Sequence, residues 1–263
     1  WVDQVSVSLA NNKILDRIDL QALPGEVTVI IGPNGSGKST LMRAMSGDIP
    51  YEGKILLNGH DIQMLKPWDL ASKRAVLPQK SILAFPFTVE EVVHIGLRNG
   101  IGAQTTKIIY DALSSVGLSA YAQRQYAELS GGEQQRVQLA RVLAQVWTPY
   151  EMGQARWIFL DEPVSSLDIA HQIEVINIAR EYARSGGGVI AIMHDLNLTS
   201  MVADKIAILH QGKTLCQGVP KDVMTDNWLS HAYECDLRVN TSPKTPATYI
   251  LPHLANTHKK KVN

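Results

Sequence analysis

A glycine-rich segment follows the apolar, β-branched run Val27–Ile31 and precedes the apolar stretch Leu41–Met45. Its residues, in order, are Gly32, Pro33, Asn34, Gly35, Ser36, Gly37, Lys38, Ser39 and Thr40. The glycines let backbone N–H groups converge on a phosphate, and the helix that follows adds its positive N-terminal dipole. In this strand–loop–helix context, we expect Lys38 to reach the β- and γ-phosphates of a nucleotide and Ser39 to bind Mg²⁺. A chance match to the pattern arises only roughly once in 100 chains of this length.

Two carboxylates, Asp161 and Glu162, directly follow a second apolar run, Trp157–Leu160. In an open α/β sheet, ligands bind beyond the carboxyl ends of the strands. We therefore expect Asp161 to hold Mg²⁺ through its water shell and Glu162 to polarise a water for attack on the γ-phosphate. The alternative is an acidic helix start stabilised by the helix dipole. A phosphate loop in the same chain favours the catalytic interpretation.

A third motif, Leu129–Glu133, combines a helix cap with paired glycines. Ser130 and Glu133 have the spacing of a capping box at the start of a predicted helix. That box does not need Gly131 and Gly132 between its partners, whereas glycines at a helix N-terminus expose N–H groups to an anion. We expect this helix end to bind phosphate as well. A second copy of the chain could bring it to the same γ-phosphate more easily than one chain could.

Short apolar runs and turns predict the elements that position these motifs. Three runs have the length of buried strands and predict a mostly parallel sheet with helices on both faces: Val27–Ile31, Trp157–Leu160 and Val189–Met193. Turns at Asn11-Asn12 and Pro24-Gly25 separate further strand-like runs. These predict a small antiparallel sheet made of Val5–Leu9, Ile14–Leu20, Val27–Ile31 and Gly53–Leu57.

Helical patterns dominate the middle of the chain, with helices predicted over Thr88–Leu97, Thr105–Val116 and Gly132–Val146. In the last, apolar residues recur on one helix face. The chain is thus expected to be a single domain over residues 1–240, with a helical subdomain inserted at about residues 84–147. The polar segment 241–263, which ends in three lysines, is predicted to be a solvated, frayed tail.

Composition excludes several classes of protein. The 263 residues carry 25 Lys and Arg against 25 Asp and Glu, so the chain lacks the positive excess of a general nucleic-acid binder. Two cysteines, Cys216 and Cys235, rule out a disulfide scaffold and suit a reducing compartment. No apolar run approaches the ~20 residues of a spanning helix, and no secretory signal is present. A role at a membrane would be that of a peripheral subunit.

Taken in this order over about residues 3–235, the motifs resemble those of the ATP-binding subunits of ABC transporters. The resemblance implies an α/β fold with a P-loop NTPase (RecA-like) core, a small N-terminal antiparallel sheet and an inserted helical subdomain. It implies a head-to-tail homodimer, with each ATP between Gly32–Thr40 of one chain and Ser130–Glu133 of the other. It also implies polytopic permease subunits, a periplasmic or extracellular substrate-binding protein reached indirectly, and a site at the cytoplasmic face of the membrane.

The same resemblance assigns roles to further residues. Gln79 is expected to touch Mg²⁺ or the attacking water and to report nucleotide state to the permease. Asp168 is expected at the dimer seam, and His194, after the run Val189–Met193, on the γ-phosphate. Two positions depart from the family pattern. Leu9 stands where an aromatic residue often stacks on adenine, and Glu133 stands where many members have Gln.

Two segments point to one branch of importers. Leu77–Ser81 and Phe85–Val93 resemble the importers of iron siderophores, haem and cobalamin. The longer segment Thr148–Arg156, before Trp157, resembles the hemin-import ATPases. Haem is therefore the expected cargo, with a siderophore or cobalamin as the alternatives. The aromatic pair Phe85 and Phe87 either packs within the helical subdomain or lines a groove for the permease, near Phe85–Glu91.

Three other classes of ATPase share parts of this pattern. Chromosome and DNA-repair relatives need a long coiled coil for which 263 residues leave no room, and zero net charge disfavours DNA binding. Translation-associated relatives normally carry two cassettes, whereas each motif occurs once here. A small-molecule kinase would leave Leu129–Glu133 and His194 without a task.

Overall fold

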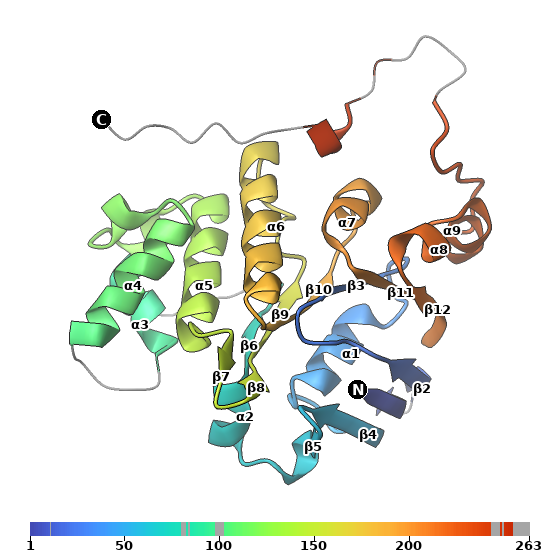
Figure 1. The fold of residues 1–263 in the computed structure, drawn as a ribbon, viewed down its shortest axis with the longest axis horizontal. Helices are drawn as coiled ribbons and strands as arrows, with labels where there is room; N and C mark the ends of the chain where they lie inside the picture. Colours follow the sequence, from blue (N-terminus) through green and yellow to red (C-terminus); the bar gives the residue numbers. More distant parts are fainter. Residues whose placement is uncertain are drawn as a thin grey trace.

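The computed structural model describes residues 1–10, 12–79, 83, 85–97, 103–242, 248 and 250–254. These residues form a six-stranded sheet, a four-stranded sheet and a two-stranded hairpin, with helices packed around them (Figure 1). The fold is therefore α/β, as expected from the sequence. Among the described residues, no helix has both the length and the apolarity that crossing a bilayer requires.

The six-stranded sheet carries the phosphate loop and the two carboxylates. Its strand order is β12-β11-β3-β10-β9-β6, and all neighbours are parallel except β11 and β12. The bounds are β3 (Val27–Ile31), β6 (Arg74–Leu77), β9 (Trp157–Asp161), β10 (Gly188–Ile192), β11 (Lys205–His210) and β12 (Lys213–Gly218). Every residue of β3, β9 and β10 is buried, which explains why these strands appear as continuous apolar runs.

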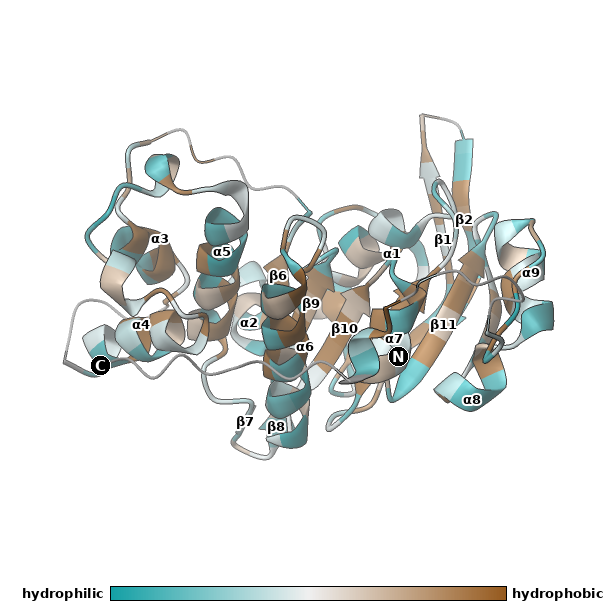
Figure 2. Ribbon diagram, turned by 90° about the horizontal axis from the view of Figure 1, so that it is seen from above, coloured by the Kyte–Doolittle hydropathy of each residue, from teal (hydrophilic) through white to brown (hydrophobic). Residues whose placement is uncertain are grey.

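Both faces of this sheet are covered, because alternate side chains of a strand point to opposite sides. Ile158 and Leu160 belong to one hydrophobic core, and Trp157 and Phe159 belong to another. The first core includes α6 (Ile169–Arg184) and α7 (Leu196–Val202), and the second includes α1 (Lys38–Met45). Figure 2 shows the hydrophobic strands between these helices. The prediction of helices on both faces is confirmed.

The antiparallel sheet has the order β2-β1-β4-β5 and contains three of the four runs predicted for it. Its strands are β1 (Val2–Leu9), β2 (Asn12–Leu20), β4 (Glu52–Leu57) and β5 (His60–Asp61). The assignment of Val27–Ile31 to this sheet was wrong, since that strand pairs in parallel with β10 and β11. An all-apolar strand needs cover on both faces, which only the main sheet provides. In the predicted turns, Gly25 has φ +84°, and Asn11 lies outside the described residues.

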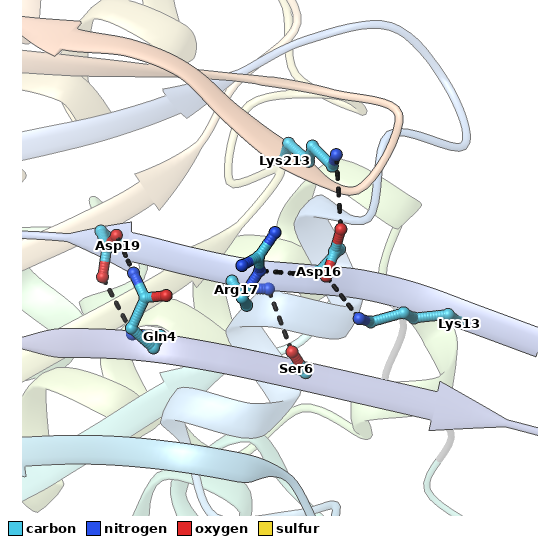
Figure 3. Close-up of polar contacts among 7 residues, drawn as sticks. All are labelled: Gln4, Ser6, Lys13, Asp16, Arg17, Asp19 and Lys213. Atoms are coloured by element: carbon cyan, nitrogen blue, oxygen red, sulfur yellow. Dashed lines mark hydrogen bonds and ion pairs between the residues drawn. The ribbon is translucent and has the colours of Figure 1, made fainter.

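Polar contacts join β2 to β12, so the edges of the two sheets are tied together (Figure 3). Lys13 pairs with Asp16 within β2, and Lys213 of β12 reaches the same carboxylate at 3.4 Å. The hydrogen bond from Lys13 is the main reason that the pKa of Asp16 is lowered. The backbone N–H of Gln21 also donates to Oε1 of Gln217 at 3.1 Å.

The predicted helices all occur, with slightly shifted bounds: α3 (Val89–Ile95), α4 (Ala103–Ser115) and α5 (Gly131–Gln145). They pack together at one end of the molecule, beyond β6 (Figures 1 and 2). Short 3₁₀ turns, Ser119–Tyr121 and Tyr126–Glu128, connect α4 to α5. Capping boxes start α3, at Thr88, and α5, at Ser130.

Several elements were not predicted. They include β5, β6, β11, β12, α6 and α7, whose bounds are given above. They also include the 3₁₀ turn Ile62–Met64, α2 (Pro67–Lys73), α8 (Pro220–Val223), α9 (Asp226–Tyr233) and the hairpin β7 (Tyr150–Glu151) and β8 (Gln154–Ala155). The hairpin lies in the segment Thr148–Arg156, for which the sequence predicts no strand. Part of the predicted frayed tail is also ordered against α7, where Ser200 hydrogen-bonds His253 at 3.0 Å. The three terminal lysines lie outside the described residues.

Candidate nucleotide-binding site

Glycines shape the loop between β3 and α1 in two different ways. Gly35 and Gly37 have φ values of +79° and +101°, which side-chain-bearing residues rarely adopt. At Gly32 the loop passes close to the backbone of Leu209, and a Cβ there would lie 2.1 Å from the Leu209 backbone oxygen. At Gly37, a Cβ would lie 2.5 Å from the Leu15 side chain. The loop conformation therefore leaves no room for a Cβ at Gly32 or Gly37 and favours glycine at Gly35.

The start of α1 has the features of an anion site. Gly37 precedes the helix and supplies no side-chain cap, so the first N–H groups of α1 keep their capacity for a ligand. The Lys38 ammonium donates to the carbonyls of Gly32 and Pro33, each at 2.9 Å. Burial lowers the pKa of Lys38, and the charges of nearby carboxylates oppose that shift. Ser36 Oγ is buried without a partner among the described residues. This cradle fits a phosphate group.

Gly212, in the turn between β11 and β12, holds the phosphate loop in place. The Gly212 N–H donates to the Ser36 carbonyl at 3.2 Å, and the Gly212 carbonyl accepts from the Asp16 N–H at 2.8 Å. Gly212 has φ +73°, and a Cβ there would lie 2.4 Å from the Ile14 carbonyl. Strand β2 and the β11–β12 turn thus clamp the loop. Sequence reasoning missed Gly212, because Gln211-Gly212 is not one of the dipeptides, such as Asn-Gly or Asp-Gly, that signal a hairpin turn.

Asp161 ends β9 directly beside the phosphate loop. Asp161 is 7% exposed, and its carboxylate accepts a long hydrogen bond, 3.5 Å, from Ser39. Burial is the main reason that the pKa of Asp161 is raised, and the Glu162 charge raises it further. Ser39 and Lys38 only partly offset this. A buried carboxylate next to a hydroxyl is a donor set that suits a hard divalent cation such as Mg²⁺.

Glu162 follows Asp161 with φ +55°, in the left-handed region. Its N–H donates to the Ile192 carbonyl at 3.1 Å, and its carboxylate lies 2.6 Å from Nε2 of His194. Burial raises the pKa of Glu162, but hydrogen bonds from His194 and Gln79 and the nearby positive charges outweigh it, so the net shift is downward. Glu162 is therefore ionised at neutral pH and can accept a proton.

The structure brings together one group of the predicted residues and leaves a second group apart. Lys38, Ser39, Asp161, Glu162, Gln79 and His194 are connected by hydrogen bonds or electrostatic contacts. Among the described residues, no hydrogen bond or ion pair joins Ser130–Glu133 or Asp168 to the phosphate loop. Asp168 instead caps α6, accepting the His171 N–H at 3.0 Å.

The capping box predicted at α5 is present. The Ser130 hydroxyl donates to the Glu133 carboxylate at 2.7 Å, and the Ser130 N–H donates to the same group at 2.8 Å. These bonds lower the pKa of Glu133. A Cβ on Gly131 would meet nothing within 4 Å, so this helix end is open to an approaching group. Leu9, at the position expected to face adenine, is only partly buried at the end of β1.

Replacing Asp161 with Asn is expected to stabilise the nucleotide-free chain while abolishing hydrolysis. Because the pKa of Asp161 in the folded chain lies above its ordinary value of 3.8, the ionised carboxylate opposes folding at neutral pH. The variant should melt a few degrees higher, at about 2–4 °C per kcal/mol for a chain of this size. The difference in melting temperature between the variant and the original chain should shrink as pH falls through the raised pKa of Asp161 towards 3.8. Residue 161 is then neutral in both proteins. Melting curves from pH 4 to 8 measure this, and a lower melting temperature for the variant at pH 7 contradicts it.

Comparisons with known proteins agree with this geometry. Residues 15–165 match the family model described as "ABC transporter". The "Hemin import ATP-binding protein HmuV" of Jannaschia sp. (strain CCS1) is 60% identical over 254 residues, or 97% of this chain and 94% of that relative. The protein of the same name from Roseobacter denitrificans (strain ATCC 33942 / OCh 114) is 59% identical over 252 residues, or 96% of this chain and 97% of that relative.

A solved structure shows the same fold. It is an ATP-binding cassette of an ABC transporter in its ADP conformation, with a TM-score of 0.76 and 23% identity over 89% of this chain and 97% of that one. The family match, the two close relatives and the cluster around the phosphate loop agree. This chain belongs to the ABC transporter family, as an ATP-hydrolysing subunit whose hydrolysis is coupled to transport.

Proposed function

We propose that this chain powers the import of haem across the cytoplasmic membrane. It would lie at the cytoplasmic face, bound to polytopic permease subunits, and would reach a periplasmic or extracellular substrate-binding protein only through them. The observation that supports haem as the cargo is the name shared by two relatives, which are 60% and 59% identical to this chain over nearly its whole length. The observation that carries the chemistry is the ionised Glu162 beside the phosphate loop, in contact with His194 and Gln79.

In this proposal, ATP lies with its phosphates on Gly32–Thr40. The open N-terminus of α1 and the ammonium of Lys38 bind the β- and γ-phosphates. Ser39, Gln79 and Asp161 would hold Mg²⁺, which neutralises charge that develops on the phosphates. Glu162 accepts a proton from the attacking water, and His194 hydrogen-bonds the γ-phosphate once nucleotide is present.

Two copies of the chain would complete each site in a head-to-tail dimer. Ser130–Glu133 lies apart from the phosphate loop of its own chain, yet its helix start is open at Gly131. Seated on the γ-phosphate of the partner's ATP, this helix end would add its N–H groups and the Ser130 hydroxyl. Asp168 would lie at the seam. Residues 1–240 would act as one ATP-binding domain, with 84–147 as a moving helical subdomain and 241–263 as a tail.

The structure separates the two aromatic residues proposed to face the permease. Phe85 is 71% exposed, whereas Phe87 packs against the main hydrophobic core. Their rings meet edge to face, with centroids 6.0 Å apart. The Phe87 carbonyl also accepts the Tyr126 N–H at 2.9 Å, which fixes the segment to the helices. We therefore assign the permease contact to Phe85 and a supporting role to Phe87. Lys80 and Ser81, in the neighbouring importer-like segment, lie outside the described residues.

Phe85→Ala is expected to keep folding and basal ATPase but to weaken permease binding about tenfold or more, as for an exposed aromatic anchor. Phe87→Ala is the matched control, since it removes a core contact and should lower the melting temperature by several degrees. Co-purification with the permease and coupled transport measure the first effect, and thermal melting measures the second. If Phe85→Ala couples normally and only melts earlier, the permease contact lies elsewhere.

Reconstitution with the permease tests the cargo. Proteoliposomes containing both subunits should show ATP-dependent uptake of haem and no comparable uptake of an iron siderophore or cobalamin. A Lys38→Ala subunit provides the inactive control. Uptake of a siderophore or cobalamin in place of haem would mean that the chain powers the import of that compound and not of haem. Stable retention of the chain on DNA or ribosomes, without a permease, would contradict the transport role.

A further inference from the structure

A side chain from α5 contacts the backbone of Glu162. Nε2 of Gln135 donates to the Glu162 carbonyl at 3.0 Å. The other amide atom, Oε1 of Gln135, is buried and has no hydrogen-bond partner within the described residues. Gln135 lies on the second turn of α5, two residues after Glu133 of the capping box. Helix α5, which Ser130 caps, therefore contacts Glu162, the proposed general base.

The backbone of Glu162 depends on such contacts. Its φ of +55° lies in a region that residues with side chains seldom occupy without support. The Glu162 carbonyl also accepts from Ser165 Oγ at 3.2 Å, and the N–H is bound to Ile192. Because the peptide plane sets the direction of the side chain, the bond from Gln135 contributes to where the carboxylate points.

A second contact joins the same two segments independently. The first turn of α5 packs on the loop that follows Glu162, so a Cβ on Gly132 would lie 3.3 Å from the Leu167 side chain and 3.3 Å from the Ser166 carbonyl. The start of α5 and residues 162–167 are thus in contact at two points, one polar and one steric. A displacement of α5 along its axis would therefore strain or break both contacts.

We propose that Gln135 is a positioning residue that links α5 to the proton-accepting carboxylate of Glu162 in the same chain. This rests on the proposed head-to-tail dimer, in which the N-terminus of α5 meets the ATP held by the partner. Seating of that ATP on α5 would then set Glu162 in the chain's own site. Each site would respond to the occupancy of the other, and hydrolysis would depend cooperatively on ATP concentration.

Gln135→Met tests the link, because Met has similar length and no amide donor. The expected result is normal ATP affinity, a kcat lowered about tenfold or more, and a Hill coefficient moved towards 1, since small misplacements of catalytic groups have large kinetic effects. Gln145→Met is the matched control. Gln145 sits at the other end of α5 and likewise donates to backbone carbonyls, those of Ala71 and Arg74.

The two variants should lose similar thermal stability, and only Gln135→Met should change kcat and cooperativity. Equal kcat and Hill coefficients in the two variants would overturn the proposal. Mixed dimers show whether Gln135 acts on Glu162 of its own chain or on the ATP that binds to α5. In a dimer where one chain carries Lys38→Ala, ATP occupies only the phosphate loop of the other chain. Gln135→Met should slow hydrolysis when placed in the chain with the intact Lys38.

If hydrolysis slows only when Gln135→Met is placed in the Lys38→Ala chain, Gln135 supports ATP binding on α5, and this result would also overturn the proposal.

Failure of the proposed dimer is distinguishable from failure of the link between Gln135 and Glu162. If Ser130→Arg leaves hydrolysis intact while Gln135→Met slows it and Gln145→Met does not, the head-to-tail site is wrong and the positioning role remains. If Ser130→Arg abolishes hydrolysis and Gln135→Met does not change it, the dimer stands and the link is wrong.

Discussion

Glu162→Gln is expected to bind ATP normally and to hydrolyse it about 10²–10⁴-fold more slowly, the usual contribution of a general base. The amide keeps the size of the side chain and its contact with His194 but cannot accept the proton of the attacking water. In the proposed head-to-tail dimer, both chains hold each ATP until it is hydrolysed, so the variant should also accumulate as an ATP-bound dimer. Single-turnover hydrolysis and size-exclusion chromatography with ATP measure the two effects.

Glu181→Gln is a suitable control, since Glu181 is exposed on α6 and remote from the phosphate loop in the sequence. It makes the same chemical change and should leave turnover and oligomeric state unaltered. Near-normal turnover in Glu162→Gln would remove Glu162 from the role of base. Loss of ATP binding instead would mean that its charge supports the nucleotide site and does not act on water.

The second large effect is expected from mixed dimers of Lys38→Ala and Ser130→Arg chains. Each homodimer carries one lesion in every site and should be nearly inactive. In a mixed dimer, one site carries both lesions and the other carries neither, because each site of the proposed head-to-tail dimer takes Lys38 and Ser130 from different chains. Random mixing makes about half of the dimers mixed, each with one of two sites intact. Independent sites would therefore return about a quarter of wild-type activity, and the coupling proposed through Gln135 would return less.

ATPase activity after unfolding and refolding the two variants together gives the measurement. Separately refolded variants, combined only at the assay, provide the baseline. Recovery above that baseline supports the composite site. Without any recovery, while wild-type chains regain activity under the same protocol, either Ser130 acts within its own chain or both sites must be intact for either to work.

The local parts of the site could be predicted because neighbouring residues encode them. The strand Val27–Ile31, the glycine loop and α1 are continuous in sequence, and Asp161 and Glu162 end a strand whose apolar pattern is unbroken. The capping box at Ser130 is likewise local, and the structure contains it. Such features depend on backbone conformation and the placement of strand ends, which short-range sequence patterns specify.

The remaining parts depend on contacts between distant segments. Val27–Ile31 was assigned to two sheets at once, because its pattern shows that both faces are buried but does not show which strands lie beside it. The contact of Gln135 with Glu162 joins residues 27 apart through a single amide. The clamp at Gly212 joins three segments. No local pattern distinguishes this glutamine from Gln134, whose amide donates to Tyr126 and Leu129 within its own segment.

The order of strands in the main sheet has a consequence for synthesis of the chain. β3, which leads into the phosphate loop, lies between β10 and β11, whose residues come more than 150 positions later. The loop itself is clamped by Gly212. A nascent chain therefore cannot assemble its nucleotide pocket until just over four-fifths of the sequence has left the ribosome, and sheets built from such distant pairings form slowly. Unfinished or truncated chains would have no ATP site with which to compete for the permease.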